Sequence, residues 1–261
     1  DIEENIEASP GEIIADGTIH RFDVDAVGDK KGWYAAHFTE EVSYAVYGDW
    51  SEGQIYRWHS LKDTVITPAQ SKKLKSAMLE AQKIRNEERA LEQSEATKKC
   101  KELWNAVADA PDDHPYLKKK GVKPYGIKLH QSNNNLIIPV LSSGKTSSLQ
   151  SIKESGKKSF FPNGKVSGGY HLIGDVGPLV LMCEGYATGA SLYEATGIPT
   201  VVAFNAGNLP KVAKELKKEY PDANFIICAD NDKWTPGNPG RTKATEAAEV
   251  LSGIVAYPTF K

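Results

Sequence analysis

Residues 179–257 alternate between short apolar runs and longer segments that favour helix. The apolar runs lie at 179–183, 200–204, 225–229 and 254–257, and the helix-forming segments lie near 187–196, 209–219 and 241–251. Parallel strands need long crossover connections, which are usually helices, so repeated units of this length predict a parallel sheet with right-handed crossovers. This part of the chain is therefore predicted to be an α/β domain.

Acidic residues follow two of these predicted strands. Glu184 follows the run at 179–183, and Asp230 and Asp232 follow the run at 225–229. Because ligands bind at the carboxyl ends of strands in an open parallel sheet, we expect the three carboxylates to lie close together. Oxygen donors of this kind suit Mg²⁺ or Mn²⁺, so the pattern predicts a metal-dependent phosphoryl-transfer site. The alternatives are a helix-capping Glu184 and an Asx turn at Asp230.

The turn after the first strand supports a phosphate site. Gly185 lets the backbone bend sharply and lets a ligand approach closely, and the helix that follows directs free N–H groups toward the same edge. Arg241 and Lys243 open the last predicted helix after a loop rich in Pro and Gly. These two cations are expected either to meet phosphates or to form a solvated helix start.

The composition is that of an ordinary soluble protein. The chain has 261 residues, of which 40% are apolar and 25% charged, and its net charge of −2 gives no overall nucleic-acid signature. Its three cysteines are widely separated, so buried reduced thiols are expected and zinc is not. With no apolar run of membrane-spanning length and no signal-like start, we expect a cytoplasmic protein. The first residue is not Met, which we interpret as the start of a piece of a longer protein.

The rest of the chain is predicted to form three further parts. Residues 1–66 contain short alternating runs at 18–22, 32–38, 42–50 and 54–58, typical of a small antiparallel β unit. Residues 67–111 have no Gly or Pro after Pro68 until Pro111 and favour one or two helices. Residues 112–176 are expected to be mixed α/β with an antiparallel sheet, and residues 177–261 contain the parallel sheet.

The sequence from Ser143 to Thr146 resembles the end of a phosphate-binding P-loop. The full motif requires a glycine where this chain has Pro139, and a strand rather than a helix follows. A β-hairpin turn at Ser143-Gly144 is therefore the favoured interpretation.

Three tryptophans of the first part, Trp33, Trp50 and Trp58, are candidates for stacking on single-stranded nucleic acid. They lie near Lys30, Lys31 and Arg57, and aromatic rings with cations can follow a single strand. Half-buried aromatics that hold a small sheet together are the alternative, and it is favoured.

Several motifs resemble those of one family. Glu184-Gly185 and Asp230-x-Asp232, in this order of strands and helices, resemble the Toprim domain of primases, topoisomerases and some nucleases. Residues 136–140, the Gly144 hairpin and residues 157–160 resemble the segment before Toprim in bacterial-type primases. Further resemblance to phage and plasmid primases or primase-helicases is carried by residues 114–121, 16–22, 32–34 and 48–50. The resemblance covers nearly the whole chain.

This resemblance implies a DNA primase that makes short RNA primers on single-stranded DNA during phage or plasmid replication. Ribonucleoside triphosphates are the implied substrates, and a replicative helicase, as a further domain or a separate protein, is the implied partner. Glu184, Asp230 and Asp232 would be catalytic and bind metal. Lys158 matches a primase lysine that would contact template or nucleotide phosphate, and Lys145, Lys153, Lys157 and Lys165 are candidates for a basic groove or are plain surface lysines.

The chain departs from the family pattern in three features, and three alternatives remain open. This chain has no Cys/His zinc ribbon and no helicase motor, and its loop at 233–240 is longer than the expected turn. A Toprim nuclease would use the same carboxylates to hydrolyse DNA, and a single-stranded-DNA-binding module would have lost catalysis. A topoisomerase is disfavoured because no suitable tyrosine context stands out.

Overall fold

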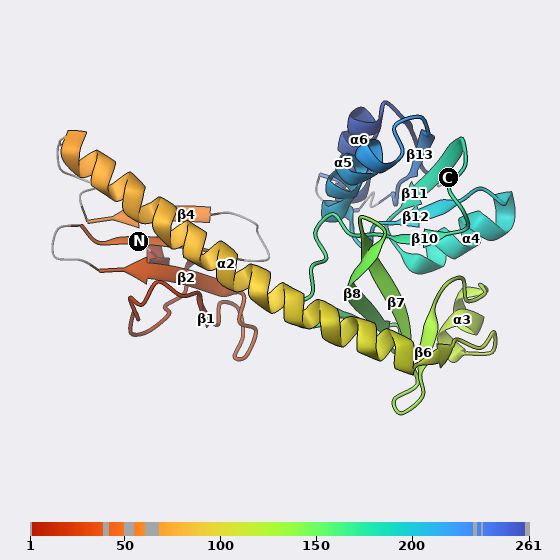
Figure 1. The fold of residues 1–261 in the computed structure, drawn as a ribbon, viewed down its shortest axis with the longest axis horizontal. Coiled ribbons are helices and arrows are strands. Elements are labelled where there is room, and N and C mark those ends of the chain that lie inside the picture. Colours follow the sequence, from red (N-terminus) through yellow and green to blue (C-terminus); the bar gives the residue numbers. More distant parts are fainter. Residues whose placement is uncertain are drawn as a thin grey trace. The chain divides into compact units, whose positions relative to one another are not determined.

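The chain divides into two compact units. The computed structural model describes residues 2–38, 42–49, 55–60, 68–231, 234–235 and 237–258, and the units are Asp1–Arg89 and Ala90–Lys261 (Figure 1). Helix α2 (Pro68–Ala106) is one continuous helix that contains the boundary between them. The four-part division at 66, 111 and 176 stays a prediction.

The first unit is an antiparallel β unit, as predicted. Its four strands are hydrogen-bonded in sequence order. Helix α1 (Ile2–Ile6) precedes β1 (His20–Phe22), β2 (Gly32–His37), β3 (Tyr44–Asp49) and β4 (Ile55–His59). Successive side chains of a strand point to opposite faces, so Tyr34 and Ala36 share a face with their cross-strand partners Tyr47 and Ala45. These four buried side chains, with Phe22, form the core of this unit.

The second unit begins with a five-stranded antiparallel sheet. Its strands, in spatial order, are β5 (Ala108–Asp109), β6 (Lys128–His130), β7 (Asn135–Ser142), β8 (Lys145–Ile152) and β9 (Lys158–Phe160). Ser143 and Gly144 both have positive φ, 49° and 68°, and two left-handed residues make the turn whose twist suits a hairpin. This confirms the hairpin that was preferred to a P-loop.

A short helix, α3 (Pro115–Lys120), lies between β5 and β6, and its sequence explains its bounds. His114 caps its start by accepting a hydrogen bond from the Tyr116 N–H at its Nδ1 (3.2 Å), and Pro115 occupies the first turn. Gly121 ends it in the left-handed conformation, with φ 67°. The lysines of α3 therefore lie at its C-terminal end.

A second sheet of five strands confirms the predicted α/β domain. The spatial order is β10-β12-β11-β13-β14, and β11, β12, β13 and β14 are mutually parallel while β10 pairs antiparallel at the edge. The strands are β10 (His171–Ile173), β11 (Leu179–Cys183), β12 (Thr200–Val202), β13 (Asn224–Cys228) and β14 (Ile254–Ala256). The helices are α4 (Tyr186–Thr196), η1 (Ala206–Asn208), α5 (Leu209–Glu219) and α6 (Pro239–Leu251).

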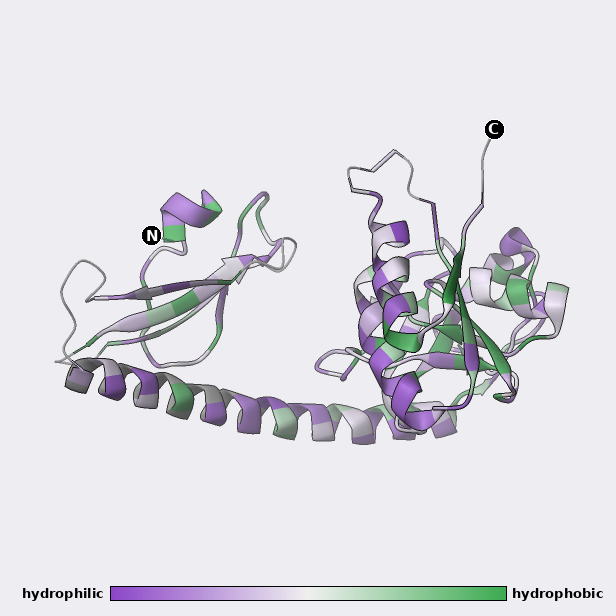
Figure 2. Ribbon diagram, turned by 90° about the horizontal axis from the view of Figure 1, so that it is seen from above, coloured by the Kyte–Doolittle hydropathy of each residue, from purple (hydrophilic) through white to green (hydrophobic). Residues whose placement is uncertain are grey.

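Helices cover both faces of this sheet. Val180 and Met182 of β11 pack with α5 and α6 on one face, whereas Cys183 packs with α4 on the other. Figure 1 shows these helices on the two sides of the sheet. In Figure 2, the strands of this sheet are mostly in the green of hydrophobic residues, as expected for strands buried on both faces. Gly189 lets α4 approach closely, because a Cβ there would stand 2.6 Å from Val202 Cγ2.

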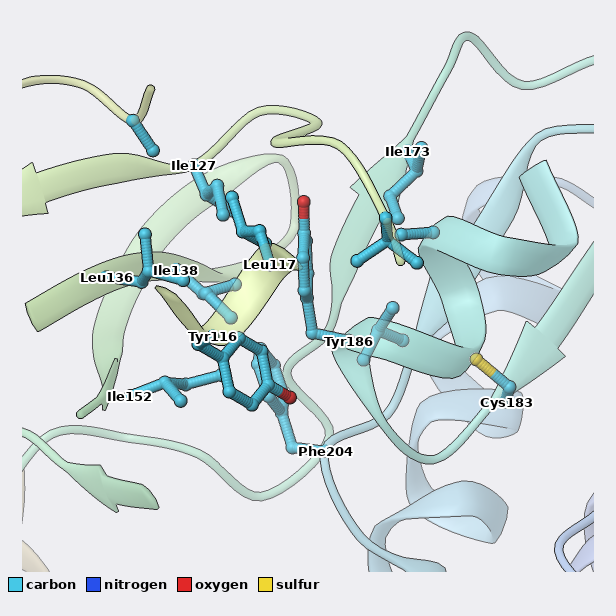
Figure 3. Close-up of a cluster of buried hydrophobic side chains, with 14 of the residues drawn as sticks. Tyr116, Leu117, Ile127, Leu136, Ile138, Ile152, Ile173, Cys183, Tyr186 and Phe204 are labelled. Carbon is cyan, nitrogen blue, oxygen red and sulfur yellow. The ribbon is translucent and has the colours of Figure 1, made fainter. Parts of the chain in front are cut away.

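The two sheets of the second unit share a hydrophobic core. Side chains of α3 and the antiparallel sheet, among them Leu117 and Ile138, meet Tyr186 and Phe204 from the parallel sheet domain (Figure 3). The packing fixes α4 relative to the antiparallel sheet. No helix in the part of the chain that the structure describes has the length and apolar character needed to cross a bilayer.

Candidate active site

Glu184 and Asp230 lie at the carboxyl edge of the parallel sheet. They follow β11 and β13, which are neighbours with Met182 opposite Ile227. The charges of both carboxylates act on the same buried thiol: burial first, then Cys228, Asp230 and Glu184, raise the pKa of Cys183 well above its usual value. Asp230 is exposed, whereas Glu184 is half-buried. The structure therefore places two of the three predicted carboxylates together.

Lys158 joins these carboxylates from the other sheet. It is the first residue of β9, and its Nζ lies 3.7 Å from the position that a Cβ on Gly185 would occupy. Loss of water contacts and then repulsion from Lys120 lower the pKa of Lys158, while attraction to Asp230 and Glu184 opposes this. The residue as a whole is exposed, but its ammonium group is enclosed enough for desolvation to be the main influence. The structure thus brings Lys158 to the candidate metal ligands.

Gly185 supplies space rather than a bend. Its φ of −107° and ψ of 148° are extended values that any residue adopts, so the sharp turn expected from the sequence is not the reason for glycine here. The missing side chain leaves the position beside the Lys158 ammonium open. Helix α4 starts at the next residue with no side-chain cap, and the N–H groups of such a helix start favour phosphate.

A group of exposed lysines, which we call the basic surface, lies on α3, on the turn that leads into β9 and at the start of β9. Gly156 lies against the ring of Tyr116, since a Cβ there would be 3.8 Å from Tyr116 Cε2. Helix α3 therefore packs on the turn that leads into β9. The basic surface consists of the exposed residues Lys118, Lys119, Lys120, Lys153, Lys157 and Lys158. Glu154, the acid of this turn, is hydrogen-bonded by Asn134.

Lys120 is a candidate functional residue that the sequence interpretation missed. Its charge acts on Lys158, which places it near the carboxylate edge. The signal was present as three consecutive lysines before Gly121. Their orientation depends on how α3 packs against residues 153–157, which no local pattern encodes.

Of the other predicted phosphate-binding cations, one lies far from Lys158 and two contact other side chains. Lys145 begins β8, whereas Ile152, the cross-strand partner of Lys158, ends it. At about 3.3 Å per residue, these two ends of the strand are about 23 Å apart. The Arg241 guanidinium lies 4.4 Å from the ring centre of Tyr257. Lys243 forms an ion pair with Glu246 at 2.7 Å. Of the lysines predicted from the sequence, Lys153, Lys157 and Lys158 belong to the basic surface.

The third predicted metal ligand, Asp232, lies outside the described residues. Next to it, Asn231 donates a hydrogen bond to the Pro258 carbonyl (2.9 Å) and accepts one from Asn238 (2.9 Å), so the end of β13 is tied to α6 and to the chain after β14. Within the described ranges, no three His, Cys, Asp or Glu side chains gather as a metal site. Glu184 and Asp230 offer the hard oxygen donors that a divalent cation such as Mg²⁺ prefers.

Phe204, which lies just after β12 at the carboxyl edge of the parallel sheet, has a strained backbone. It follows β12 with φ 72°, a conformation that costs a bulky residue about 1–3 kcal/mol. The ring packs edge-on against Phe160 of β9 at 5.6 Å between centroids. The side chain of buried Asn208 donates to the Ala203 carbonyl (2.9 Å) and accepts from the Gly168 N–H (2.8 Å). These contacts hold the strained turn in place.

The predicted stacking tryptophans differ in exposure. Trp33 is 7% exposed, Trp58 is half-buried, and Trp50 lies outside the described residues. The burial of Trp33 favours the alternative in which these aromatic residues hold the sheet together.

Comparisons with known proteins agree with the motifs. Residues 179–258 match the Toprim domain family, which confirms the expected Toprim domain. The chain is 31% identical over 260 residues to a protein named DNA primase TraC from Escherichia coli, a match that covers 95% of this chain and 24% of that protein. A second Escherichia coli protein of the same name is 33% identical over 266 residues, covering 95% and 18%. The resemblance to DNA primases is thus confirmed, and the chain spans about a quarter or less of these relatives.

A solved structure of the DnaG catalytic core is also similar. The TM-score is 0.41 and the sequence identity 11%, and the match covers 65% of this chain and 72% of that one.

Proposed function

We propose that this chain, with its Toprim domain at residues 179–258, is the primer-synthesising part of a DNA primase. The observation that carries the proposal is the meeting of Glu184, Asp230 and Lys158, which come from two different sheets, at one edge. Similarity to DNA primase TraC along 95% of the chain supports it. Single-stranded DNA would be the template, and ribonucleoside triphosphates would be the substrates.

Glu184 and Asp230 would hold a divalent cation, Mg²⁺ or Mn²⁺, with Asp232 as the third carboxylate. When bound, such a cation would neutralise charge on the triphosphate and help to activate the primer 3′-hydroxyl for attack on the α-phosphate. Glu184 would act as a ligand or as the acid/base partner of that hydroxyl.

The remaining residues of the edge would bind and orient phosphate. The Lys158 ammonium and the first N–H groups of α4 are donors that converge beside the open position at Gly185. Lys118, Lys119 and Lys120 would hold the backbone of the template next to this position, and such contacts weaken as salt concentration rises. The lysines act by charge and therefore carry no sequence preference.

The chain would have four parts and a helicase partner. Residues 1–66, 67–111, 112–176 and 177–261 would be an N-terminal domain, a helical connector, the leading part of the primase core and the Toprim domain. A replicative helicase, as a domain or as a separate protein, would be the partner that supplies single-stranded template during phage or plasmid replication.

The test is primer synthesis by this chain on a single-stranded DNA circle with four ribonucleotides and Mg²⁺. We expect short RNA products, and we expect Asp230→Asn to lower their yield at least about 100-fold, because several kcal/mol of charge stabilisation would be lost. Asp222→Asn, which changes an exposed acid just before the same strand, is the matched control and should retain full activity. Degraded template without RNA would identify a nuclease, and unchanged strands would leave a binding module.

A further inference from the structure

The first unit contains a cavity of about 350 Å³ between its N-terminal segment and one face of its sheet. We call it the aromatic pocket, because Tyr34, Tyr47, Trp58 and Phe38 line it. The rest of the lining consists of Ile2, Glu3, Ser9, Pro10, Gly11, Ile13, Ala36 and Ala45. Phe38 is 56% exposed, a degree of solvent contact that places it at the rim.

The arrangement of large and small side chains on the sheet creates this cavity. Ala36 and Ala45 are cross-strand partners and lie beside the Tyr34–Tyr47 pair, and Trp58 is the partner of Ala45 on the next strand. Two small residues in the middle of an aromatic face leave a hollow that the neighbouring rings surround. The pocket is therefore a product of strand register.

Hydrogen bonds hold the N-terminal segment over the hollow. The Tyr34 hydroxyl accepts from the Ile14 N–H at 3.0 Å. The Tyr47 hydroxyl accepts from Asn5 Nδ2 at 2.9 Å. The N-terminal segment is thus hydrogen-bonded to the sheet near both of its ends.

The segment of the chain that forms the pocket is rich in acidic residues. Residues 1–66 contain fourteen acidic and five basic residues, a net charge of −9, whereas residues 112–176 contain four acidic and ten basic ones. Two of the five cations are already engaged: Lys30 pairs with Asp23 at 3.3 Å, and Lys31 pairs with Asp25. Negative charge at this density repels nucleic-acid phosphates and attracts cations.

Acidic residues also lie at the pocket itself. Glu3 lines the cavity. Burial and the charge of nearby Glu4 both raise the pKa of Tyr47. Aromatic rings together with a carboxylate are suited to a cation that carries an apolar stem.

We propose that the aromatic pocket docks a lysine- or arginine-bearing segment of a partner protein. The apolar stem of one such side chain would lie among Tyr47, Trp58 and Phe38, and its cationic head would face the rings and Glu3. The acidic surface of the unit would hold the flanking basic residues of the segment. This interaction goes beyond primer synthesis and does not rest on it.

The test uses the full chain and a fluorescein-labelled decapeptide of alternating glycine and arginine, followed by fluorescence anisotropy. We expect saturable binding that becomes about tenfold weaker in Phe38→Ser and about threefold weaker in Glu3→Gln, in line with the usual strength of cation–π contacts. Ile55→Ser is the matched control, because Ile55 is 55% exposed on the same sheet and does not line the pocket. Circular dichroism of each variant verifies that the fold is retained.

Four outcomes would overturn the proposal. The first is that the peptide does not bind. The second is that the parent chain and Phe38→Ser bind it equally, which would indicate diffuse charge attraction. Weaker binding of a labelled oligothymidylate by Phe38→Ser would instead make the pocket a stacking site for single strands. Self-association that Phe38→Ser abolishes would make it an interface between two copies of this chain.

Discussion

Lys158 connects the two sheets of the second unit electrostatically. A lysine whose ammonium loses water contacts is costly unless anions compensate, and here Asp230 and Glu184 attract it while Lys120 repels it. The arrangement leaves the ammonium partly uncompensated beside the open position at Gly185. A phosphate group at this position would complete the charge balance.

Replacement of Lys158 by Met is therefore expected to weaken primer synthesis. Loss of one charge-assisted hydrogen bond, about 1.5–3 kcal/mol, corresponds to a decrease in kcat/KM of about 10- to 100-fold. Lys158→Arg retains the charge and should restore part of the activity. Initial rates at varied nucleotide and template concentrations measure the effect.

Lys145→Met is the matched control for this experiment. The residue is an exposed lysine of the same sheet, but it lies at the far end of β8. It should retain nearly full activity at physiological salt, where charges more than about 8 Å apart are largely screened. An equal loss in both variants would show that the lysines act only through the overall field.

At the scale of elements, the start of α4 decides where the phosphate donors point. Tyr186, its first residue, is fully buried. Its hydroxyl oxygen accepts from the Tyr125 N–H at 2.6 Å, and its O–H donates to the Lys123 carbonyl at 3.1 Å. The segment before β6 thereby fixes the N-terminus of α4 against the antiparallel sheet that carries Lys158.

Tyr186→Phe should lower both stability and activity. It would leave a backbone N–H and a carbonyl without this partner, at a cost of about 1–3 kcal/mol, which lowers Tm by several degrees for a unit of this size. Tyr193→Phe on the same helix is the control, because it keeps the edge-on ring contact with Tyr125. Thermal melts and primer assays of both variants measure the difference, and equal melts would assign no positioning role to Tyr186.

Local patterns determined the elements around the site, but not the contacts between them. The strand at 179–183 and its carboxylate were predictable because an apolar run and the residue that follows it are adjacent in sequence. The antiparallel edge strand β10 was not, because strand order depends on pairing between distant segments. Lys120 and the strained turn at Phe204 were missed for the same reason: each depends on packing against β9 or the turn before it.

Strand register likewise limited what could be said of the first unit. Alternation puts neighbouring residues on opposite faces of a strand, but it does not say which face is covered. Trp33 proved buried and Trp58 half-buried in the structure. The hollow over Ala36 and Ala45 follows from pairing between β2 and β3, which only the folded chain shows.

At the scale of the whole molecule, the two units differ in charge and in chemistry. The described carboxylates of the candidate site, Glu184 and Asp230, and every lysine of the basic surface belong to Ala90–Lys261. The excess of acidic residues lies in the first 66 residues. A divalent cation bound through the site carboxylates should therefore stabilise the second unit specifically, although the first unit is the more acidic one.

Hydrogen exchange of the full chain with and without Mn²⁺ tests this expectation. At a free concentration ten times its dissociation constant, a ligand adds about 1.4 kcal/mol to the stability of the unit that binds it. Amides of β11, β13 and α4 that exchange through unfolding of the unit should then exchange about tenfold more slowly. Those of β1–β4 should be unchanged, and Asp230→Asn should remove the effect. Equal protection of both units would mean that Mn²⁺ binds acidic residues at large, and protection that persists in Asp230→Asn would exclude Asp230 as a ligand.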